Sequence, residues 1–200
     1  MKTYKVLLVV AFLFSQVTFA KTRVLFLGDS LTEGYGIDKS HAYPFLVEQR
    51  LKNLGKHIEA INAGITGSTT ASAKSRLQWQ LKNKPDILVL ALGANDGLRG
   101  INVKISQKQL TETVQLAKTN GITVLLVGMK LPPNFGPAYA KSFEKMFEQI
   151  AQSEKVYFLP FLLEGVGGVP SLNLSDGIHP NEKGHSIIAD TVVKALQKLL

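Results

Sequence analysis

Five residues in this 200-residue sequence have the types and settings that acyl transfer by a serine requires. Ser30 follows directly on an apolar run and a Gly-Asp pair, and Asp176 stands three residues before His179. A serine hydroxyl attacks an acyl carbon when a base removes its proton and a carboxylate fixes the tautomer of that base. Donors must also face the carbonyl oxygen as it gains charge, and Gly64 and Asn95 each come shortly after an apolar run.

Each of these residues also has an ordinary structural explanation. Serine is a good helix N-cap, Gly-Asp-Ser is common in turns, and a glycine or asparagine after a strand suits a plain turn. Asp29 and Asp96 compete with Asp176 as the carboxylate, since one adjoins Ser30 and the other adjoins Asn95. The remaining histidines have no comparable neighbours and are expected to be structural or solvated: His41, His57 and His185.

Four sequence blocks occur in the order that is typical of one enzyme family. The blocks GDSL, NAGITGST, GAND and DGIHPN resemble those of the GDSL, or SGNH, hydrolase family, and the similarity spans essentially all of residues 21–200. Within that family the chain most resembles the periplasmic multifunctional bacterial enzymes described as acyl-CoA thioesterase, lysophospholipase and arylesterase. The segments that carry this closer resemblance are LGANDGLRG (Leu92–Gly100) and Pro132–Phe147. Ala94 departs from the family's more common glycine but leaves Asn95 in place.

The resemblance assigns a role to each candidate residue. It implies that Ser30 is the nucleophile, that His179 is the general base and then acid, and that Asp176 orients His179. It also implies an oxyanion hole made of the Ser30 N–H, the Gly64 N–H and the Asn95 side chain. Asp29 and Asp96 become second choices for the carboxylate. No cofactor and no metal is implied.

The acyl group would need an apolar surface near Ser30. The segment Met129–Gly136 follows the fourth expected strand and contains two prolines and two large apolar residues. In the enzymes that the chain resembles, a segment here contacts the acyl chain. We therefore expect Leu131 and Phe135 to bind substrate, although a loop of this composition is often only a loop.

Short apolar runs alternate with longer amphipathic ones along the chain, which predicts an α/β fold. The expected strands are Arg23–Leu27, His57–Asn62, Asp86–Leu92, Ile122–Gly128 and Val156–Leu159. The expected helices are Ala42–Leu54, Ala71–Leu81, Ser106–Thr119, Pro137–Ala151 and Asn181–Leu199. Such alternation gives a five-stranded parallel sheet between two helical layers, a flavodoxin-like α/β/α sandwich whose ligands bind at the carboxyl ends of the strands.

The first twenty residues differ from the rest. A basic start, an uncharged apolar stretch and a small residue at Ala20 are typical of a secretory signal peptide, so we expect residues 1–20 to be cleaved and 21–200 to form one catalytic domain. A membrane anchor is the alternative, but the uncharged stretch is short of the roughly 20 apolar residues that span a bilayer. The chain contains no cysteine that a lipid anchor could use. We expect a periplasmic protein.

The formal net charge of +8 favours no particular partner, because the lysines are scattered and form no run. We expect a monomer that binds small acyl esters, thioesters or lysophospholipids and no nucleic acid. Two other functions stay open: a carbohydrate acetylesterase of the same family and a non-catalytic lipid-binding relative. A flavodoxin-like phosphate binder is disfavoured because residues 28–36 lack the GxGxxG pattern.

Overall fold

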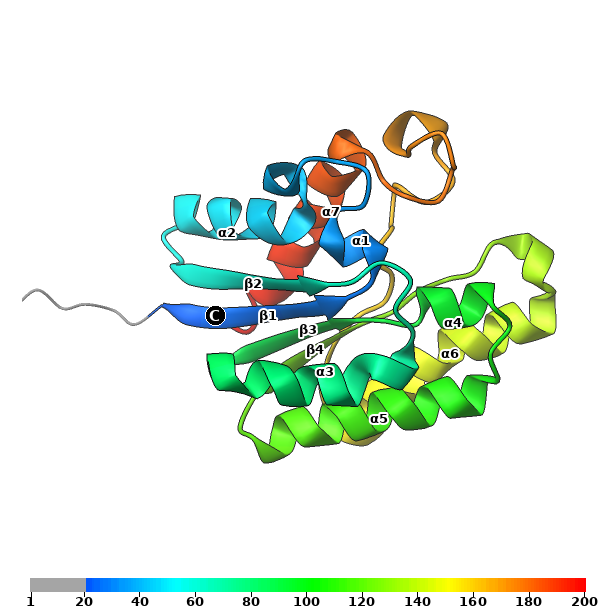
Figure 1. Ribbon diagram of the computed structural model, residues 1–200, viewed down its shortest axis with the longest axis horizontal. Helices are drawn as coiled ribbons and strands as arrows, with labels where there is room; N and C mark the ends of the chain where they lie inside the picture. Colours follow the sequence, from blue (N-terminus) through cyan, green and yellow to red (C-terminus); the bar gives the residue numbers. More distant parts are fainter. Residues whose placement is uncertain (1–20) are drawn as a thin grey trace, which may run out of the picture.

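A computed structural model describes residues 21–200, so the expected signal peptide lies outside the described residues. The chain forms one five-stranded sheet in which every neighbouring pair of strands is parallel, in the order β2-β1-β3-β4-β5 (Figure 1). This confirms the predicted parallel sheet. The strands are β1 (Thr22–Gly28), β2 (Ile58–Gly64), β3 (Ile87–Ala91), β4 (Thr123–Val127) and β5 (Tyr157–Leu159).

The central strands are apolar along their whole length because helices cover both of their faces. Every residue of β3 is buried, as is β1 from Val24 onwards. The register pairs Gly28 at the end of β1 with Gly64 of β2 on one side and with Ala91 of β3 on the other. The strand order reverses beside β1, and ligands of open α/β sheets bind at such a point.

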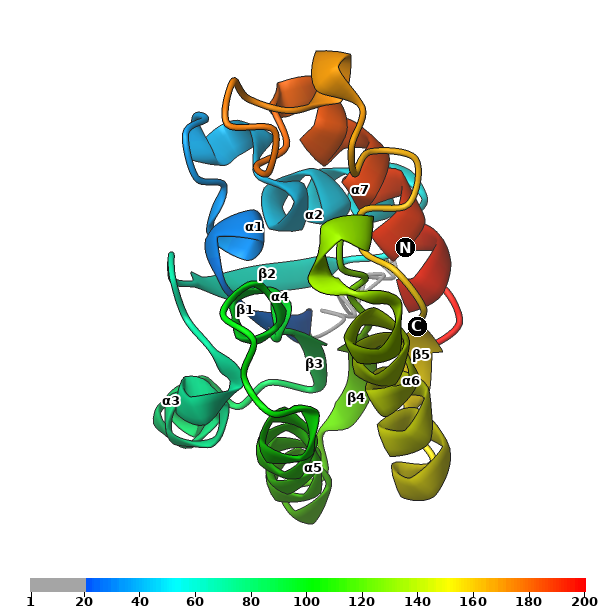
Figure 2. The same cartoon turned by 90° about the vertical axis from the view of Figure 1, so that its right-hand side faces the viewer.

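Two layers of helices enclose the sheet (Figure 2). The helices α2 (Tyr43–Asn53) and α7 (Glu182–Leu196) pack against each other on one face. On the other face, α5 (Val103–Thr119) packs between α3 (Ala73–Gln80) and α6 (Pro137–Glu154). This confirms the predicted three-layer sandwich. The buried side chains of residues 21–200 form one hydrophobic cluster, and none of the helices described is long and apolar enough to cross a bilayer.

Two short helices were not predicted from the sequence: α1 (Ser30–Glu33) follows β1, and α4 (Ala94–Leu98) follows β3. Each is too short to show a helical period. The longer helices differ from the prediction mainly at their ends; α5, for example, begins at Val103 because the Asn102 side chain caps it by accepting the Lys104 N–H. Single 3₁₀ turns complete the chain: η1 (Lys39–His41), η2 (Thr70–Ser72), η3 (Leu81–Asn83), η4 (Pro133–Phe135) and η5 (Pro170–Leu172).

Candidate active site

Ser30 is the first residue of α1, at the carboxyl end of β1, which lies between β2 and β3 in the sheet. The Asp29 side chain caps the helix by accepting the Leu31 N–H at 3.0 Å. The turn is tight: a Cβ added to Gly28 would lie 1.9 Å from Thr32 Oγ1, so only glycine lets α1 fold back over the strand. As a result the Ser30 side chain is held at the sheet edge, 7% exposed.

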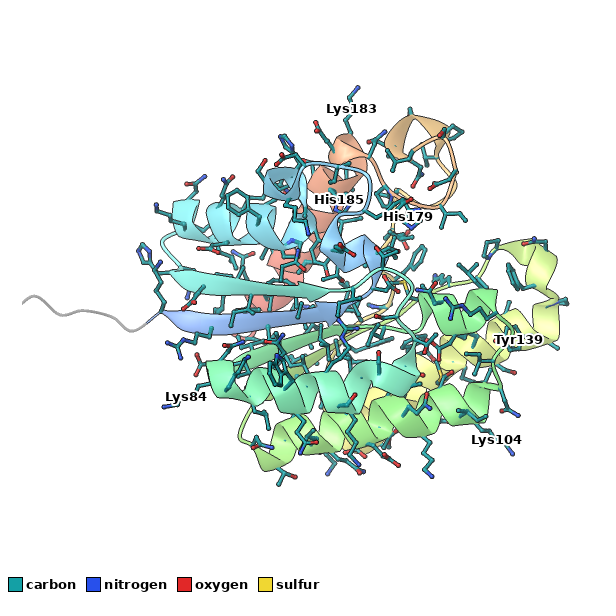
Figure 3. All side chains as sticks on the ribbon, in the orientation of Figure 1. Lys84, Lys104, Tyr139, His179, Lys183 and His185 are labelled. Carbon is teal, nitrogen blue, oxygen red and sulfur yellow. The ribbon has the colours of Figure 1, made fainter. Side chains whose placement is uncertain are left out.

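His179 and Asp176 lie in the loop before α7, and Figure 3 shows His179 near His185, which belongs to α7. Backbone bonds close the loop, because Leu174 N donates to His179 O at 2.7 Å and Gly177 N donates to Leu174 O at 2.9 Å. The Asp176 Oδ1 atom accepts the N–H groups of Ile178 and His179 at 2.9 and 3.0 Å. The Asp176 side chain therefore holds the backbone of the loop, and the backbone N–H groups hold the Asp176 carboxylate in place.

The structure brings Ser30, His179 and Asp176 into one line of hydrogen bonds. His179 Nε2 lies 3.0 Å from Ser30 Oγ, and His179 Nδ1 lies 2.7 Å from Asp176 Oδ2. The N–H groups that Asp176 accepts, together with His179, lower the pKa of its carboxyl to about 2, so Asp176 is ionised at neutral pH. An ionised carboxylate accepts a hydrogen bond from Nδ1–H, which keeps the imidazole proton on Nδ1 and leaves Nε2 free to accept the Ser30 proton.

The exposed ring of Tyr35 lies beside His179, with ring centroids 4.5 Å apart at 40°. Tyr35 comes two residues after the end of α1, so the segment that contains Ser30 also contacts His179. The ring thereby limits the positions that the imidazole can adopt.

Asn95 lies in α4 and directs its side-chain amide to the same place. Its Nδ2 atom donates to Ser68 O at 3.0 Å, and the second contact, to Asp29 Oδ2, is long at 3.5 Å. One amide hydrogen is thus weakly engaged. The Ser30 N–H also has no acceptor within residues 21–200.

Gly64, whose N–H is expected to be an oxyanion donor, lies at the end of β2. Its N–H donates to Asn62 Oδ1 at 2.9 Å, so this N–H already has an acceptor. A Cβ added to Gly64 would lie 2.1 Å from Glu33 N, which means that the backbone of α1 packs directly on the end of β2. Gly64 is a glycine because of this close approach, and it does not present a free donor to Ser30.

Gly67, three residues further on, is not among the candidates that the sequence suggested. Residues 65–68 form a turn in which Ser68 N donates to Ile65 O at 3.2 Å and Gly67 has a φ of 77°. The Gly67 N–H has no acceptor among residues 21–200, its carbonyl accepts Arg99 Nη2 at 3.1 Å, and the next residue binds Asn95. The Ile-Thr-Gly-Ser pattern, with glycine where a type II turn requires positive φ, was the signal available.

The two alternative carboxylates have other partners. Asp96 is 1% exposed and accepts the Thr70 N–H at 2.9 Å and the Ser106 hydroxyl at 2.9 Å, so it ties α4 to η2 and α5. Asp29 is fully buried and caps α1, and burial raises its pKa to about 6. Neither carboxylate forms a hydrogen bond with His179 in the described residues.

The other histidines take the structural or solvated roles expected of them. His185 is 1% exposed, accepts the Tyr43 N–H through Nδ1 at 3.2 Å and stacks on the Tyr43 ring. Burial lowers its pKa to about 4, so it is neutral near pH 7. His41 is exposed 3.2 Å from Glu182, and His57 is exposed at the start of β2.

The segment that follows β4 contains Leu131 and Phe135, and it leaves the sheet at the same end as α1, the helix that begins with Ser30 (Figure 1). Leu131 is partly buried and lies against α4, since a Cβ added to Gly97 would be 2.5 Å from Leu131 Cδ2. Phe135 is partly buried in η4. Leu131 thus lies against Gly97, which is two residues along α4 from Asn95, and this place agrees with a role next to the acyl group. Substrate binding by Leu131 and Phe135 stays a prediction.

Comparison with known proteins gives a consistent result. The model of the GDSL-like Lipase/Acylhydrolase family matches residues 26–187. Esterase TesA of Pseudomonas aeruginosa is 39% identical, with 90% of each chain covered. The thioesterase 1/protease 1/lysophospholipase L1 of Escherichia coli is 35% identical over 90% of this chain and 86% of that one. The crystal structure of the psychrotrophic esterase EstA from Pseudoalteromonas, inhibited by monoethylphosphonate, has a TM-score of 0.85 at 32% identity, covering 90% of this chain and 98% of that chain.

Proposed function

This chain belongs to the GDSL-like lipase/acylhydrolase family, and on that premise we propose that it hydrolyses carboxylic esters and thioesters with Ser30 as the nucleophile. The observation that carries the proposal is the continuous line Ser30 Oγ, His179 and Asp176, at 3.0 and 2.7 Å. A serine in hydrogen-bond contact with a histidine that a carboxylate orients is the arrangement that activates a hydroxyl for acyl transfer.

The first half of the reaction forms an acyl-serine. His179 Nε2 takes the proton of Ser30 while Oγ bonds to the acyl carbon, and the carbonyl oxygen becomes an oxyanion. The imidazolium that forms is stabilised by ionised Asp176. We assign the oxyanion donors to the Ser30 N–H, the Gly67 N–H and the Asn95 Nδ2. Within residues 21–200 neither backbone N–H has an acceptor, and the second contact of Asn95 Nδ2 is long at 3.5 Å.

The acyl-serine forms when the oxyanion collapses, the bond to the alcohol or thiol breaks and His179 gives its proton to that leaving group. The second half regenerates the enzyme, as His179 removes a proton from a water molecule that attacks the acyl-serine. The carbon–Oγ bond breaks, and Ser30 recovers its proton from His179. Thiols leave more readily than alcohols, and no residue of the site has to distinguish them, so one site serves esters and thioesters.

The substrate class follows from the relatives that share most of the chain. One is named an esterase, and another is named a thioesterase and lysophospholipase. We therefore propose acyl esters, acyl thioesters and lysophospholipids as substrates, with Leu131 and Phe135 along the acyl chain.

A substrate panel tests the proposal. The protein starting at Lys21 is assayed with p-nitrophenyl esters of increasing acyl length, an acyl-CoA and a lysophospholipid. We expect turnover of esters and thioesters, and we expect it to be lost in Ser30→Ala and kept in the control Ser153→Ala, an exposed serine of α6 whose hydroxyl donates to Ile150 O at 3.2 Å. Absence of turnover, or full activity in Ser30→Ala, contradicts the proposal. A sharp preference for acetyl esters instead indicates a carbohydrate acetylesterase.

We further propose that residues 1–20 direct export to the periplasm and that residues 21–200 act as a monomeric single domain. Support comes from the residue types of the first twenty positions and from the single buried cluster of the rest. Expression of the full chain in a Gram-negative host, with fractionation and mass spectrometry, should find a periplasmic protein beginning at Lys21. A cytoplasmic protein that keeps residues 1–20 would overturn this.

A further inference from the structure

Arg76 of α3 reaches under the site to the ends of two strands. Its Nη2 atom donates to the Gly28 carbonyl at 2.9 Å and also to the Ala63 carbonyl. The Gly28 carbonyl accepts a second hydrogen bond, from Ile65 N at 3.2 Å. One guanidinium nitrogen therefore joins the backbone that leads into Ser30 to the backbone that leads into the 65–68 turn.

These two stretches of backbone carry the proposed oxyanion donors. Gly28 is two residues before Ser30, and Ala63 is four residues before Gly67. The distance between the Ser30 and Gly67 N–H groups thus depends on how the ends of β1 and β2 are held, where the last paired residues are Gly28 and Gly64. Arg76 binds carbonyls at this end of both strands.

Stability alone does not explain an arginine at this position. The Nη1 atom of Arg76 is buried without a hydrogen-bond partner in the described part of the chain, and burial lowers the pKa of the guanidinium. An unpaired buried donor is unfavourable, and an apolar side chain of similar length would avoid it. An apolar side chain would lack the two hydrogen bonds of the Nη2 atom and the charge near Asp29.

Its charge acts on Asp29, next to the nucleophile. Asp29 is fully buried, and the Leu31 N–H, His179 and Arg76 each oppose the rise in its pKa that burial causes, while Tyr43 is the other titratable group near it. Ionised Asp29 accepts the Leu31 N–H and faces Asn95 Nδ2. Arg76 thereby helps to hold the first turn of α1 and the Asn95 amide.

We propose that Arg76 is a positioning residue for the oxyanion hole, joining the carbonyls of Gly28 and Ala63 so that the donors on the two strand ends stay at the correct separation. The inference rests on the proposed function. It makes α3, which contributes no residue to the Ser30–His179–Asp176 line, necessary for the rate of the acyl-transfer step.

Arg76 has one competing role, which is substrate binding. Together with Trp79 and Ile65, it lines a surface hollow of about 420 Å³ beside the end of β2. A cation in such a hollow would bind the anionic part of a substrate such as acyl-CoA. This role predicts a higher KM for anionic substrates alone, whereas positioning predicts a lower kcat for neutral and anionic substrates alike.

The test uses Arg76→Met, Arg76→Lys and the control Arg50→Met. Arg50 is also a partly buried arginine that bridges two elements, since it donates to the carbonyl and hydroxyl of Ser186 and pairs with Asp190 at 2.8 Å, but it lies between α2 and α7. For p-nitrophenyl butyrate and an acyl-CoA we measure kcat, KM, the pH profile of kcat, the rate of inactivation by a p-nitrophenyl phosphonate, and the melting temperature.

In Arg76→Met we expect kcat and the inactivation rate to fall together by roughly tenfold to a hundredfold with little change in KM, because misplaced donors reduce stabilisation of the oxyanion. Because the charge of Arg76 lowers the pKa of Asp29, its loss should raise that pKa and move the acidic limb of the kcat profile to higher pH. Arg76→Lys, which keeps the charge, should recover part of the rate and keep the pH profile near that of the parent. Arg50→Met should lower the melting temperature and leave kcat unchanged.

Three results overturn the proposal: an unchanged kcat in both Arg76 variants, a change confined to the KM of acyl-CoA, or an equal loss of kcat in Arg50→Met. If Arg76→Met does not fold, the same measurements on Arg76→Lys decide the question. If kcat, the inactivation rate and the pH profile of Arg76→Lys all match the parent, the guanidinium bridge between the two carbonyls is not needed. Failure of the proposed function has a different signature, namely an active Ser30→Ala.

Discussion

Replacing Asp176 by asparagine tests the orientation of His179. The carboxylate makes three contacts, accepting the N–H groups of Ile178 and His179 through Oδ1 and meeting His179 Nδ1 through Oδ2 at 2.7 Å. In Asp176→Asn the amide oxygen keeps the two backbone bonds, so the NH₂ group faces Nδ1. The imidazole must then carry its proton on Nε2, where it cannot accept the proton of Ser30.

The size of the effect follows from this tautomer change and from the exposure of the site. The same substitution in a deeply buried triad lowers kcat by about 10⁴. The Asp176 side chain is 39% exposed, so water partly replaces the lost interaction. We therefore expect kcat to fall by about 10²–10³, which is about 3–4 kcal/mol of transition-state stabilisation.

The assay is kcat and KM for p-nitrophenyl butyrate between pH 5 and 10, with a melting curve for each protein. Asp38→Asn is the matched control, because Asp38 is also exposed and also accepts the N–H two residues ahead, at 2.8 Å. Both variants should melt near the parent temperature. A kcat for Asp176→Asn above about a tenth of the parent value would refute the assigned role of the carboxylate.

Four further predictions concern other parts of the chain. Asn95→Ala should lower kcat by about 10²–10³ with a normal melting curve, and an unchanged kcat would remove Asn95 from the oxyanion hole. Gly64→Ala should lower the melting temperature, because its Cβ meets the α1 backbone, and a stable variant would show that α1 can shift. Leu131→Ala and Phe135→Ala should move the preferred acyl length in a p-nitrophenyl ester series; an unchanged profile contradicts their role. Burial lowers the pKa of His185 from 6.5 to about 4, so His185 binds its proton more weakly in the folded state than in the unfolded chain. It therefore contributes about 3 kcal/mol to the free energy of unfolding above pH 6.5, and this contribution is lost as the pH falls towards 4. His185→Gln should flatten this dependence in urea unfolding; the comparison with the parent is needed because buried Asp29, with its raised pKa, acts in the opposite sense between pH 4 and 6.

Much of the fold could be predicted because its signals are local. The apolar runs of β1, β3 and β4 are short and continuous, and the helices between them are long enough to show a period, so the parallel sheet follows. The Asp176 and His179 pair was also local, since a loop of three residues holds both side chains together. The short helices α1 and α4 were missed because four or five residues carry no period.

What could not be predicted depends on contacts between distant segments. The predicted donor role of Gly64 rests on its place after a strand and on the family resemblance, but its N–H donates to Asn62 and its α-carbon packs against the backbone of α1. Nothing in the sequence near Gly64 indicates that approach. Arg76 likewise has an unremarkable place on α3, and only the assembled sheet shows that its guanidinium reaches the carbonyls of Gly28 and Ala63.

The central claim, that Ser30 is the nucleophile, is tested most directly by trapping the protein with a p-nitrophenyl phosphonate and locating the adduct by peptide mass spectrometry. The proposal predicts one phosphonyl group per chain, on Ser30, with loss of esterase activity in proportion to labelling and no labelling of Ser30→Ala. An adduct on another residue, or an esterase that stays active when Ser30 is fully labelled, would contradict it.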